Sequence, residues 1–251
     1  MKSTTETGHA KNVANFEDLI SFCTAYGVNY NPSKNSISLT SLNTLYTNAL
    51  ATISNVTTTK NSFDNVTGIR QTAFATLKPL ATKVINSLSA TDALDTVIKD
   101  AKTINRKLQG SKASSSTTST TEPSTPDNST TTISTSQQSY DRLIDSFSKL
   151  IDLLNAETNY IPNETELQIA TLSSKLVSLQ AANTAVITKY TDYSNARIER
   201  NNLLYINNSS LVETALDVKK YVKSVFGASS PQYKQVSGLK FSKPKLWFFD
   251  Q

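Results

Sequence analysis

Residues able to perform acid–base, nucleophilic or metal chemistry are scarce in this chain of 251 residues. It has one histidine, His9, and one cysteine, Cys23. A serine or cysteine nucleophile needs a base beside it, and we expect His9 to lie in a polar N-terminal tail, so a Ser–His or Cys–His site is excluded. Cys23 falls on an apolar helical stripe and is expected to be a small core residue. A single thiol also excludes an intrachain disulfide and a cysteine-type zinc site.

Other catalytic signatures are equally thin. Neither GxxxxGK[ST] nor GxGxxG occurs, and one histidine cannot supply the paired Glu-x-x-His motifs of a di-iron bundle. The carboxylates Asp92, Asp95, Glu164 and Glu166 lie near expected helix starts, where the helix dipole favours them. The sequence therefore predicts no catalytic residue, no cofactor, no metal and no enzyme. The alternative left open is an enzyme that uses only carboxylates, lysine and tyrosine.

Polar residues inside two long helical stretches are the next candidates. Residues 39–77 and 169–204 carry apolar side chains in steps of three and four, a heptad pattern typical of coiled coils. The polar positions that interrupt this pattern and could set its register are Arg70, Asn183, Arg197 and Arg200. A charge on a buried seam is costly unless it is paired or reaches water. Three interpretations stay open: a side chain that extends to water, a group that fixes register and partner choice, or a ligand-binding group.

The C-terminal segment is the strongest candidate for an interaction site. Its apolar residues are not at helical spacing, and Pro244 favours an extended chain. The residues expected to make contacts are Tyr233, Leu239, Phe241, Leu246, Trp247, Phe248 and Phe249. Exposed together they would form an unusual patch for a soluble monomer. They could pack on the chain's own bundle, on a neighbouring subunit, or on a membrane surface or single-stranded nucleic acid.

A diverged duplication organises the elements that carry these residues. The sequence Asn29-Tyr30-Asn31-Pro32 reappears 130 residues later as Asn159-Tyr160-Ile161-Pro162, and Gly110 matches Gly227 at an offset of 117. Internal repeats of this length indicate paired or stacked units that share a core. Apolar spacing of three and four in both copies favours helix over strand. We therefore expect an all-α fold: an elongated helical bundle of two pseudo-repeated three-helix units with long central helices.

Boundaries follow from the same pattern. The expected segments are a polar tail (1–12), helical repeat unit one (13–110), a Ser/Thr-rich flexible linker (111–138), helical repeat unit two (139–227) and an extended basic and aromatic tail (228–251). Glycines at 110 and 227 are expected to end helices. Pro79 is expected to end the first long helix near Lys78. Asn163 with Glu166, and a serine and glutamate at 210 and 213, are predicted capping boxes.

Charge and hydropathy constrain partners and compartment. The net charge is +5, and lysines concentrate from residue 219 onward. These cations either complement helix C-termini or form a face for nucleic acid, acidic glycan or lipid headgroups. The N-terminus lacks an apolar run and no stretch approaches 18 apolar residues, so no signal peptide or transmembrane segment is expected. The compartment is unknown: cytoplasmic by default, or outside the cell by a non-classical export route.

Three phrases carry a resemblance to other proteins. Residues 8–16 (GHAKNVANF), 102–107 (KTINRK) and 229–236 (SSPQYKQV) resemble phrases in a group of uncharacterised, all-helical bacterial proteins with a tandem duplication. The resemblance implies a bacterial source and a compact bundle. It supplies no activity and no site residue.

Two functional hypotheses result. The first is a non-enzymatic structural or scaffolding protein that self-associates into a homo-oligomer through its helical seams and C-terminal tail. The second is a binding module for an anionic polymer or a membrane surface through the lysine-rich C-terminal region. No small-molecule substrate is inferred.

Overall fold

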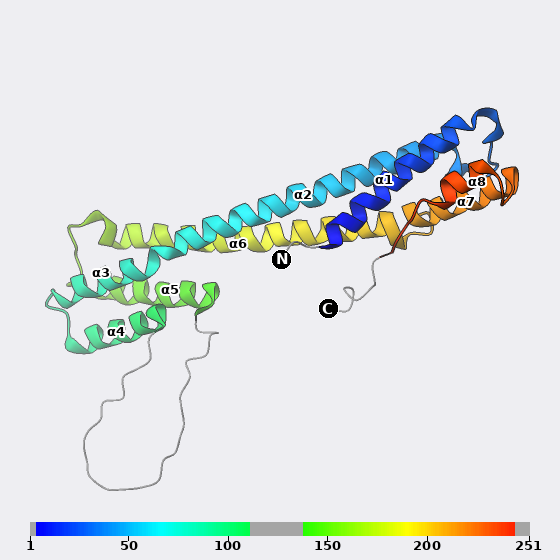
Figure 1. Cartoon of the computed structure of the whole chain (residues 1–251). Helices are drawn as coiled ribbons and strands as arrows, with labels where there is room; N and C mark the ends of the chain where they lie inside the picture. Colours follow the sequence, from blue (N-terminus) through cyan, green and yellow to red (C-terminus); the bar gives the residue numbers. More distant parts are fainter. Residues whose placement is uncertain (1–3, 111–137, 244–251) are drawn as a thin grey trace, which may run out of the picture. The chain divides into compact units, whose positions relative to one another are not determined.

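The computed structural model describes residues 4–110 and 138–243, with side chains from residue 8 onward. All regular structure in these residues is helical and no strand occurs among them, so the fold is all-α (Figure 1). The elements are α1 (Thr4–Ala25), η1 (Gly27–Asn29), η2 (Asn35–Ile37), α2 (Leu39–Ala75), α3 (Leu77–Ser89), α4 (Asp95–Gln109), α5 (Tyr140–Ala156), η4 (Thr165–Leu167), α6 (Ile169–Asn201), the π-helical turn η5 (Asn202–Ile206), α7 (Leu211–Phe226) and α8 (Pro231–Ser237).

The chain divides into two compact units that differ from the expected sequence boundaries. Unit 1 comprises residues 1–63 and 189–251, and unit 2 comprises residues 64–188. Both boundaries fall inside the longest helices, α2 and α6, so each of these helices contributes to both units. The reason is length: a helix such as α2 extends for roughly 55 Å, well beyond the core of one small unit.

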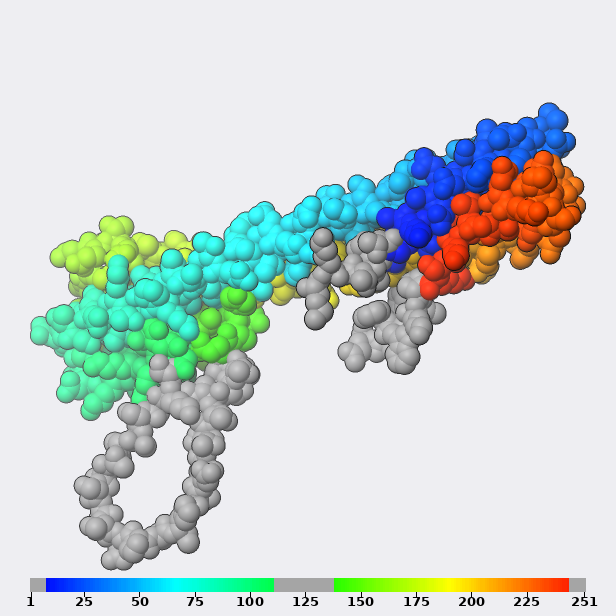
Figure 2. Space-filling model, in the orientation of Figure 1, coloured from blue at the N-terminus to red at the C-terminus, as the bar shows by residue number. Residues whose placement is uncertain are grey.

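The core of unit 1 forms between α1 and α7, with residues of α2 and η5 completing it. The α1 side chains follow helical spacing and are buried against α7 and α8, whose surfaces meet α1 in Figure 2. The principal buried residues are Val13, Phe16, Leu19, Ile20, Cys23, Leu42, Ala49, Leu204, Leu211, Ala215, Val218 and Val222. The apolar helical stripe that carries Cys23 is thus the buried face of α1, and the expectation of a core cysteine is confirmed.

Unit 2 has its own core between α3, α4, α5 and the first turns of α6. The principal buried residues are Leu77, Val84, Leu88, Ala101, Leu108, Phe147, Leu150, Leu154, Leu172 and Leu179. Leu172 and Leu179 lie seven positions apart on α6, and both are fully buried. This spacing places them on one face of the helix.

One local structure recurs 130 residues apart. The Tyr30 hydroxyl donates to the Ile37 carbonyl at 2.7 Å, and the Tyr160 hydroxyl donates to the Leu167 carbonyl at 2.9 Å. Each bond closes a loop that leads into a long helix, which begins at Leu39 in one case and at Ile169 in the other. The asparagine–tyrosine–proline phrase therefore specifies how a long helix starts.

Helix ends agree only in part with the expectations. Gly110 ends α4 in the left-handed conformation, with φ of 74°, as predicted. The break near Pro79 falls at Thr76, and the proline occupies the first turn of α3, where its missing N–H costs no helical hydrogen bond. The capping box predicted at Asn163 and Glu166 is wrong, because η4 follows it and α6 begins only at Ile169.

Both predicted tails are partly helical. Helix α1 begins at Thr4, so the polar tail expected over 1–12 does not end where predicted. Residues 231–237 form α8, whose N-terminus is capped by the Ser230 hydroxyl accepting from the Tyr233 amide, so the segment 228–251 is not extended throughout. The expected linker lies outside the described residues except for Gln138, whose side-chain amide donates to the Lys107 carbonyl at 2.9 Å.

Alkaline pH is expected to destabilise the fold through buried acids. Burial raises the pKa of the Cys23 thiol from 9.0 to about 12 and that of the Tyr160 hydroxyl from 10.0 to about 12. A raised folded-state pKa stabilises the fold fully below the unfolded-state pKa, and the contribution disappears as pH rises toward the folded-state value. We expect the free energy of unfolding, measured by urea titration, to fall by about 3 kcal/mol or more between pH 9 and 12.

A Cys23→Ala variant provides the matched control for that loss. It should be somewhat less stable at pH 8, because a buried side chain shrinks, yet it should lose less stability than the parent chain between pH 9 and 12. Identical pH slopes for the two proteins would contradict the burial of this thiol.

Candidate functional site

The C-terminal residues 238–243 are bound to α1 through their backbone. The Asn12 side-chain amide donates to the Ser242 carbonyl at 2.8 Å, and the Ser242 amide donates back to Asn12 Oδ1 at 3.1 Å. Asn15 donates to the Lys240 carbonyl at 2.6 Å. Asn12 and Asn15 are three positions apart, so both lie on one face of α1. Side chains that bind backbone groups hold a segment in place without reading its sequence.

Helix α7 binds the same segment from a second direction. The Lys219 ammonium donates to the Leu239 carbonyl and lies 5.2 Å from the centre of the Phe241 ring. Burial lowers the pKa of Lys219. Lys243 forms an ion pair with Glu213 at the end of the described segment. We call residues 238–243, together with Asn12, Asn15 and Lys219, the C-terminal clasp.

A buried polar cluster is connected to the clasp through Asn12. His9 and Asn12 are only 2% and 1% exposed. Tyr205 lies within hydrogen-bonding distance of both, with its hydroxyl 2.6 Å from His9 Nδ1 and 3.2 Å from the Asn12 amide nitrogen. Asn12 therefore joins a buried tyrosine of η5 to the backbone of the C-terminal segment.

Sequence reasoning missed this cluster because it assigned His9 to a polar tail. The available signal was spacing: residues 9, 12, 16, 19 and 23 continue one helical face in steps of three and four, and all five are buried. His9 and Asn12 are polar, and polar residues near a chain terminus are normally expected to be exposed to solvent. Their burial could be inferred only from their partners, which lie far away in the sequence.

The predicted tail residues divide into two groups. Tyr233, Leu239 and Phe241 are half-buried and pack against the core of unit 1. Lys223 lies 5.7 Å from the centre of the Tyr233 ring. For these three residues the structure shows packing on the chain's own bundle. The other predicted contacts, Leu246, Trp247, Phe248 and Phe249, lie outside the described residues.

Two of the four predicted register residues meet in unit 2. Arg70 donates to the Asn183 side-chain oxygen at 3.1 Å, and the Asn183 amide donates to Asp141 at 2.8 Å. The Arg70 guanidinium also lies 4.1 Å over the Tyr140 ring. This cluster joins α2, α5 and α6 and gives the half-buried guanidinium one hydrogen bond and an aromatic face, while Arg70 Nε has no hydrogen-bond partner among the described residues.

The other two arginines lie in unit 1 and behave differently. Arg197 is exposed and lies 5.5 Å from the centre of the Tyr193 ring. The prediction that it interrupts the buried seam is therefore wrong, because Ala196 occupies the inward position. Arg200 is 3% exposed, as a seam position should be, and donates to the Asn201 side-chain oxygen at 3.0 Å.

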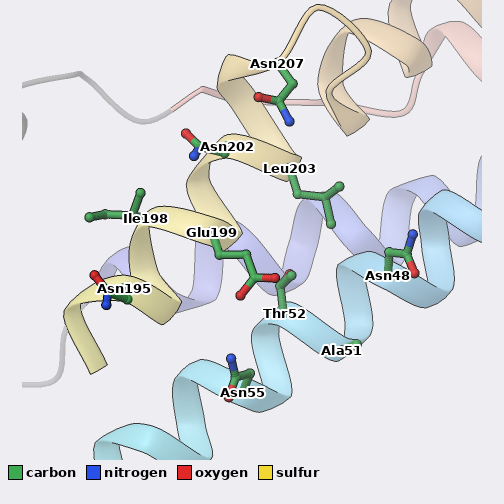
Figure 3. Close-up of a pocket in the computed structure, with 10 residues that line it drawn as sticks. All are labelled: Asn48, Ala51, Thr52, Asn55, Asn195, Ile198, Glu199, Asn202, Leu203 and Asn207. Carbon is green, nitrogen blue, oxygen red and sulfur yellow. The ribbon is translucent and has the colours of Figure 1, made fainter. Parts of the chain in front are cut away.

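A groove in unit 1 is a second candidate site, and nothing in the sequence analysis predicted it. It has a volume of about 690 Å³ and lies between α2 and the end of α6 with η5 (Figure 3). The lining residues are Asn48, Ala51, Thr52, Asn55, Asn195, Ile198, Glu199, Asn202, Leu203 and Asn207. Five asparagines from separate turns gather around one space, a proximity that only the tertiary structure reveals.

Neither a metal site, a membrane-spanning helix nor a related protein identifies a function for the described residues. Across residues 4–110 and 138–243, no three histidine, cysteine or acidic residues gather closely enough to hold a metal ion. In the same residues, no helix has both the length and the apolar character needed to cross a bilayer. No protein-family model, curated protein or solved structure matches the chain. The resemblance to bacterial helical proteins stays a prediction.

Proposed function

We propose that the chain is a non-enzymatic structural protein that self-associates through its C-terminal segment. The observation that carries this proposal is the C-terminal clasp. Two asparagines and a lysine hold the backbone of residues 239–242 at a fixed place on unit 1. The described segment thus ends at Lys243 at a fixed place on unit 1, and the sequence after it includes the apolar residues Leu246, Trp247, Phe248 and Phe249.

A second copy of the chain is the partner that the charges favour. Several described lysines near this point are engaged within the chain: Lys219 binds backbone carbonyls, Lys243 pairs with Glu213, and Lys220 shares Asp217 with Lys34, whereas the exposed Lys240 side chain makes no ion pair with a described residue. Such pairing leaves less positive charge for an anionic polymer or a membrane surface. The apolar residues, in contrast, gain by burial against another protein surface.

The proposed scaffold consists of two pseudo-repeated three-helix units with long central helices. The recurrence of the tyrosine-to-carbonyl bond at Tyr30 and Tyr160 supports this architecture. In unit 2 the half-buried Arg70–Asn183 pair would fix the register of α2 against α6, the best-attested role of a polar group in a helical seam.

Deleting residues 246–251 is expected to lower the oligomeric mass measured by light scattering coupled to size-exclusion chromatography. The deletion removes the apolar residues but leaves the clasp intact, so helicity and the thermal midpoint should not change. Burial of each large apolar side chain contributes about 1.5–3 kcal/mol, and four such residues are lost.

A full-length variant in which Leu246, Trp247, Phe248 and Phe249 are all serine controls for chain length and should behave like the deletion. A full-length protein that stays monomeric at high concentration would contradict the proposal. So would a deletion variant with the mass of the parent protein.

A further inference from the structure

We infer that the groove of unit 1 is a binding site for a neutral carbohydrate. This inference is independent of the proposed self-association, because it concerns the groove between α2 and α6–η5 rather than the C-terminal clasp. Its volume of about 690 Å³ lies within the usual range for small-molecule sites. A short oligosaccharide fits a groove of this size that is open along one side.

The hydrogen-bonding groups of the groove match sugar hydroxyls. A side-chain amide offers two donors and an acceptor, and a hydroxyl group both donates and accepts. The groove presents five such amides, from Asn48, Asn55, Asn195, Asn202 and Asn207. Among the described residues, none of these amide side chains is engaged in a hydrogen bond with another residue. Their bonding capacity is therefore available to a ligand.

The amides come from two separate elements instead of forming one row on a single helix. In Figure 3 the side chains of Asn48 and Asn55 come from α2, and those of Asn195, Asn202 and Asn207 come from α6 and its continuation. A ring of hydroxyl groups points outward from a sugar in several directions. Donors and acceptors on two facing elements can bind such a ligand on both edges.

The π-helical turn explains how two of these amides reach the same groove. Positions five apart in an α-helix differ by about 140° around the axis. The backbone N–H of Asn207, the residue that follows η5, donates to the backbone carbonyl of Asn202 at 3.1 Å, which is the wider i to i+5 turn. Both residues line the groove, and π turns of this kind occur frequently at functional sites.

Charge and apolar surface define the ligand class further. Glu199 is the single charged residue among the described residues that line the groove, and its negative charge disfavours anions such as phosphates and uronic acids. Its carboxylate can accept hydrogen bonds from two adjacent hydroxyl groups. Leu203, whose side chain extends toward α2 in Figure 3, supplies apolar surface for the C–H face of a sugar ring. These features together fit a neutral, polyhydroxylated ligand.

The test uses maltotriose, cellotriose and chitotriose as neutral probes of the full chain. Saturation-transfer NMR detects contact with the sugar protons, and calorimetry gives the dissociation constant. We expect at least one trisaccharide to bind at millimolar concentration or below. A double variant, Asn55→Ala with Asn202→Ala, removes one amide from each side of the groove and should weaken that binding at least about tenfold.

Asn61→Ala is the matched control, because Asn61 is an exposed asparagine on α2 that does not line the groove. Circular dichroism should show all variants to be equally helical, since the substituted side chains are on the surface. The inference is overturned if no trisaccharide receives saturation, if the double variant binds as well as the parent chain, or if Asn61→Ala weakens binding equally. Equal affinity for a trisaccharide bearing a carboxylate would overturn the restriction to neutral ligands.

Discussion

Replacing Leu172 by aspartate is expected to unfold unit 2, the largest effect that a single substitution should produce in this chain. Leu172 is fully buried in the core that α6 shares with α3 and α5. An aspartate there would place a carboxylate among apolar side chains without a cation to pair with it, at a cost of about 4 kcal/mol or more. Because a whole domain is stable by only about 5–15 kcal/mol, far-UV circular dichroism should show a large loss of helix.

The matched control is Val177→Asp, on the same helix of the same unit. Val177 is 63% exposed, so its replacement should change the free energy of unfolding by less than about 0.5 kcal/mol. Cys23 provides a separate probe, since it belongs to the core of unit 1. Its thiol should stay unreactive toward a thiol reagent in both variants.

Two outcomes would contradict this account of separate cores. A Leu172→Asp protein with full helicity would show that the residue is not buried as the structure has it. Rapid reaction of Cys23 in that variant, at the rate of the urea-unfolded chain, would show that unit 1 does not keep its core when unit 2 is disrupted.

The long helices were predictable because each depends on local spacing, whereas α8 was not predicted. The apolar steps on α2, α6 and α7 lie within one helix, and a glycine such as Gly110 ends a helix through its own backbone freedom. The start of each long helix was also encoded locally, in a tyrosine seven residues before its carbonyl partner. Such features need no knowledge of the rest of the fold.

Features that depend on distant partners were not predictable in the same way. Asn12 read as part of a polar tail because its partners, Tyr205 and Ser242, follow about 190 and 230 residues later. Arg70 and Asn183 were each predicted as register residues, but the hydrogen bond between them was not predicted, because it depends on how α2 and α6 align. The prediction for Arg197 was wrong because the apolar pattern alone does not distinguish neighbouring positions on the buried face of a helix. Ala196, one position earlier, is the buried residue.

The groove shows a third kind of limit. Asparagine is common throughout this chain, so the five asparagines of the groove do not stand out from the others in the sequence. Their meaning arises only from convergence, and convergence depends on the π turn at η5. Nothing in the residues 202–206 marks a π turn in advance, since it differs from an α-turn by a single hydrogen-bond shift.

Replacing Asn12 by alanine is expected to release the C-terminal segment and to lower the free energy of unfolding by about 2–4 kcal/mol. The substitution leaves the backbone N–H and carbonyl of Ser242 without their side-chain partner and removes one bond from the Tyr205 hydroxyl. The Tyr205 hydroxyl and the Asn12 site are buried, and a polar group that loses its partner in a buried site costs about 1–3 kcal/mol, while the exposed Ser242 loses two part-buried bonds. Hydrogen exchange at the Ser242 amide should accelerate, because that amide donates to Asn12 in the parent protein. Trypsin should also cleave sooner after Lys240.

Asn15→Ala separates the clasp from a general loss of stability. Asn15 binds a single carbonyl, that of Lys240, at an exposed position, so its replacement should cost less than about 1 kcal/mol and leave the Ser242 amide protected. The clasp holds the point from which the proposed self-association surface begins, so Asn12→Ala should weaken the oligomer while Asn15→Ala should not. Protection of the Ser242 amide that is unchanged in the Asn12 variant would contradict the clasp itself. Accelerated exchange with an unchanged oligomer would instead show that the clasp exists but does not position the partner surface.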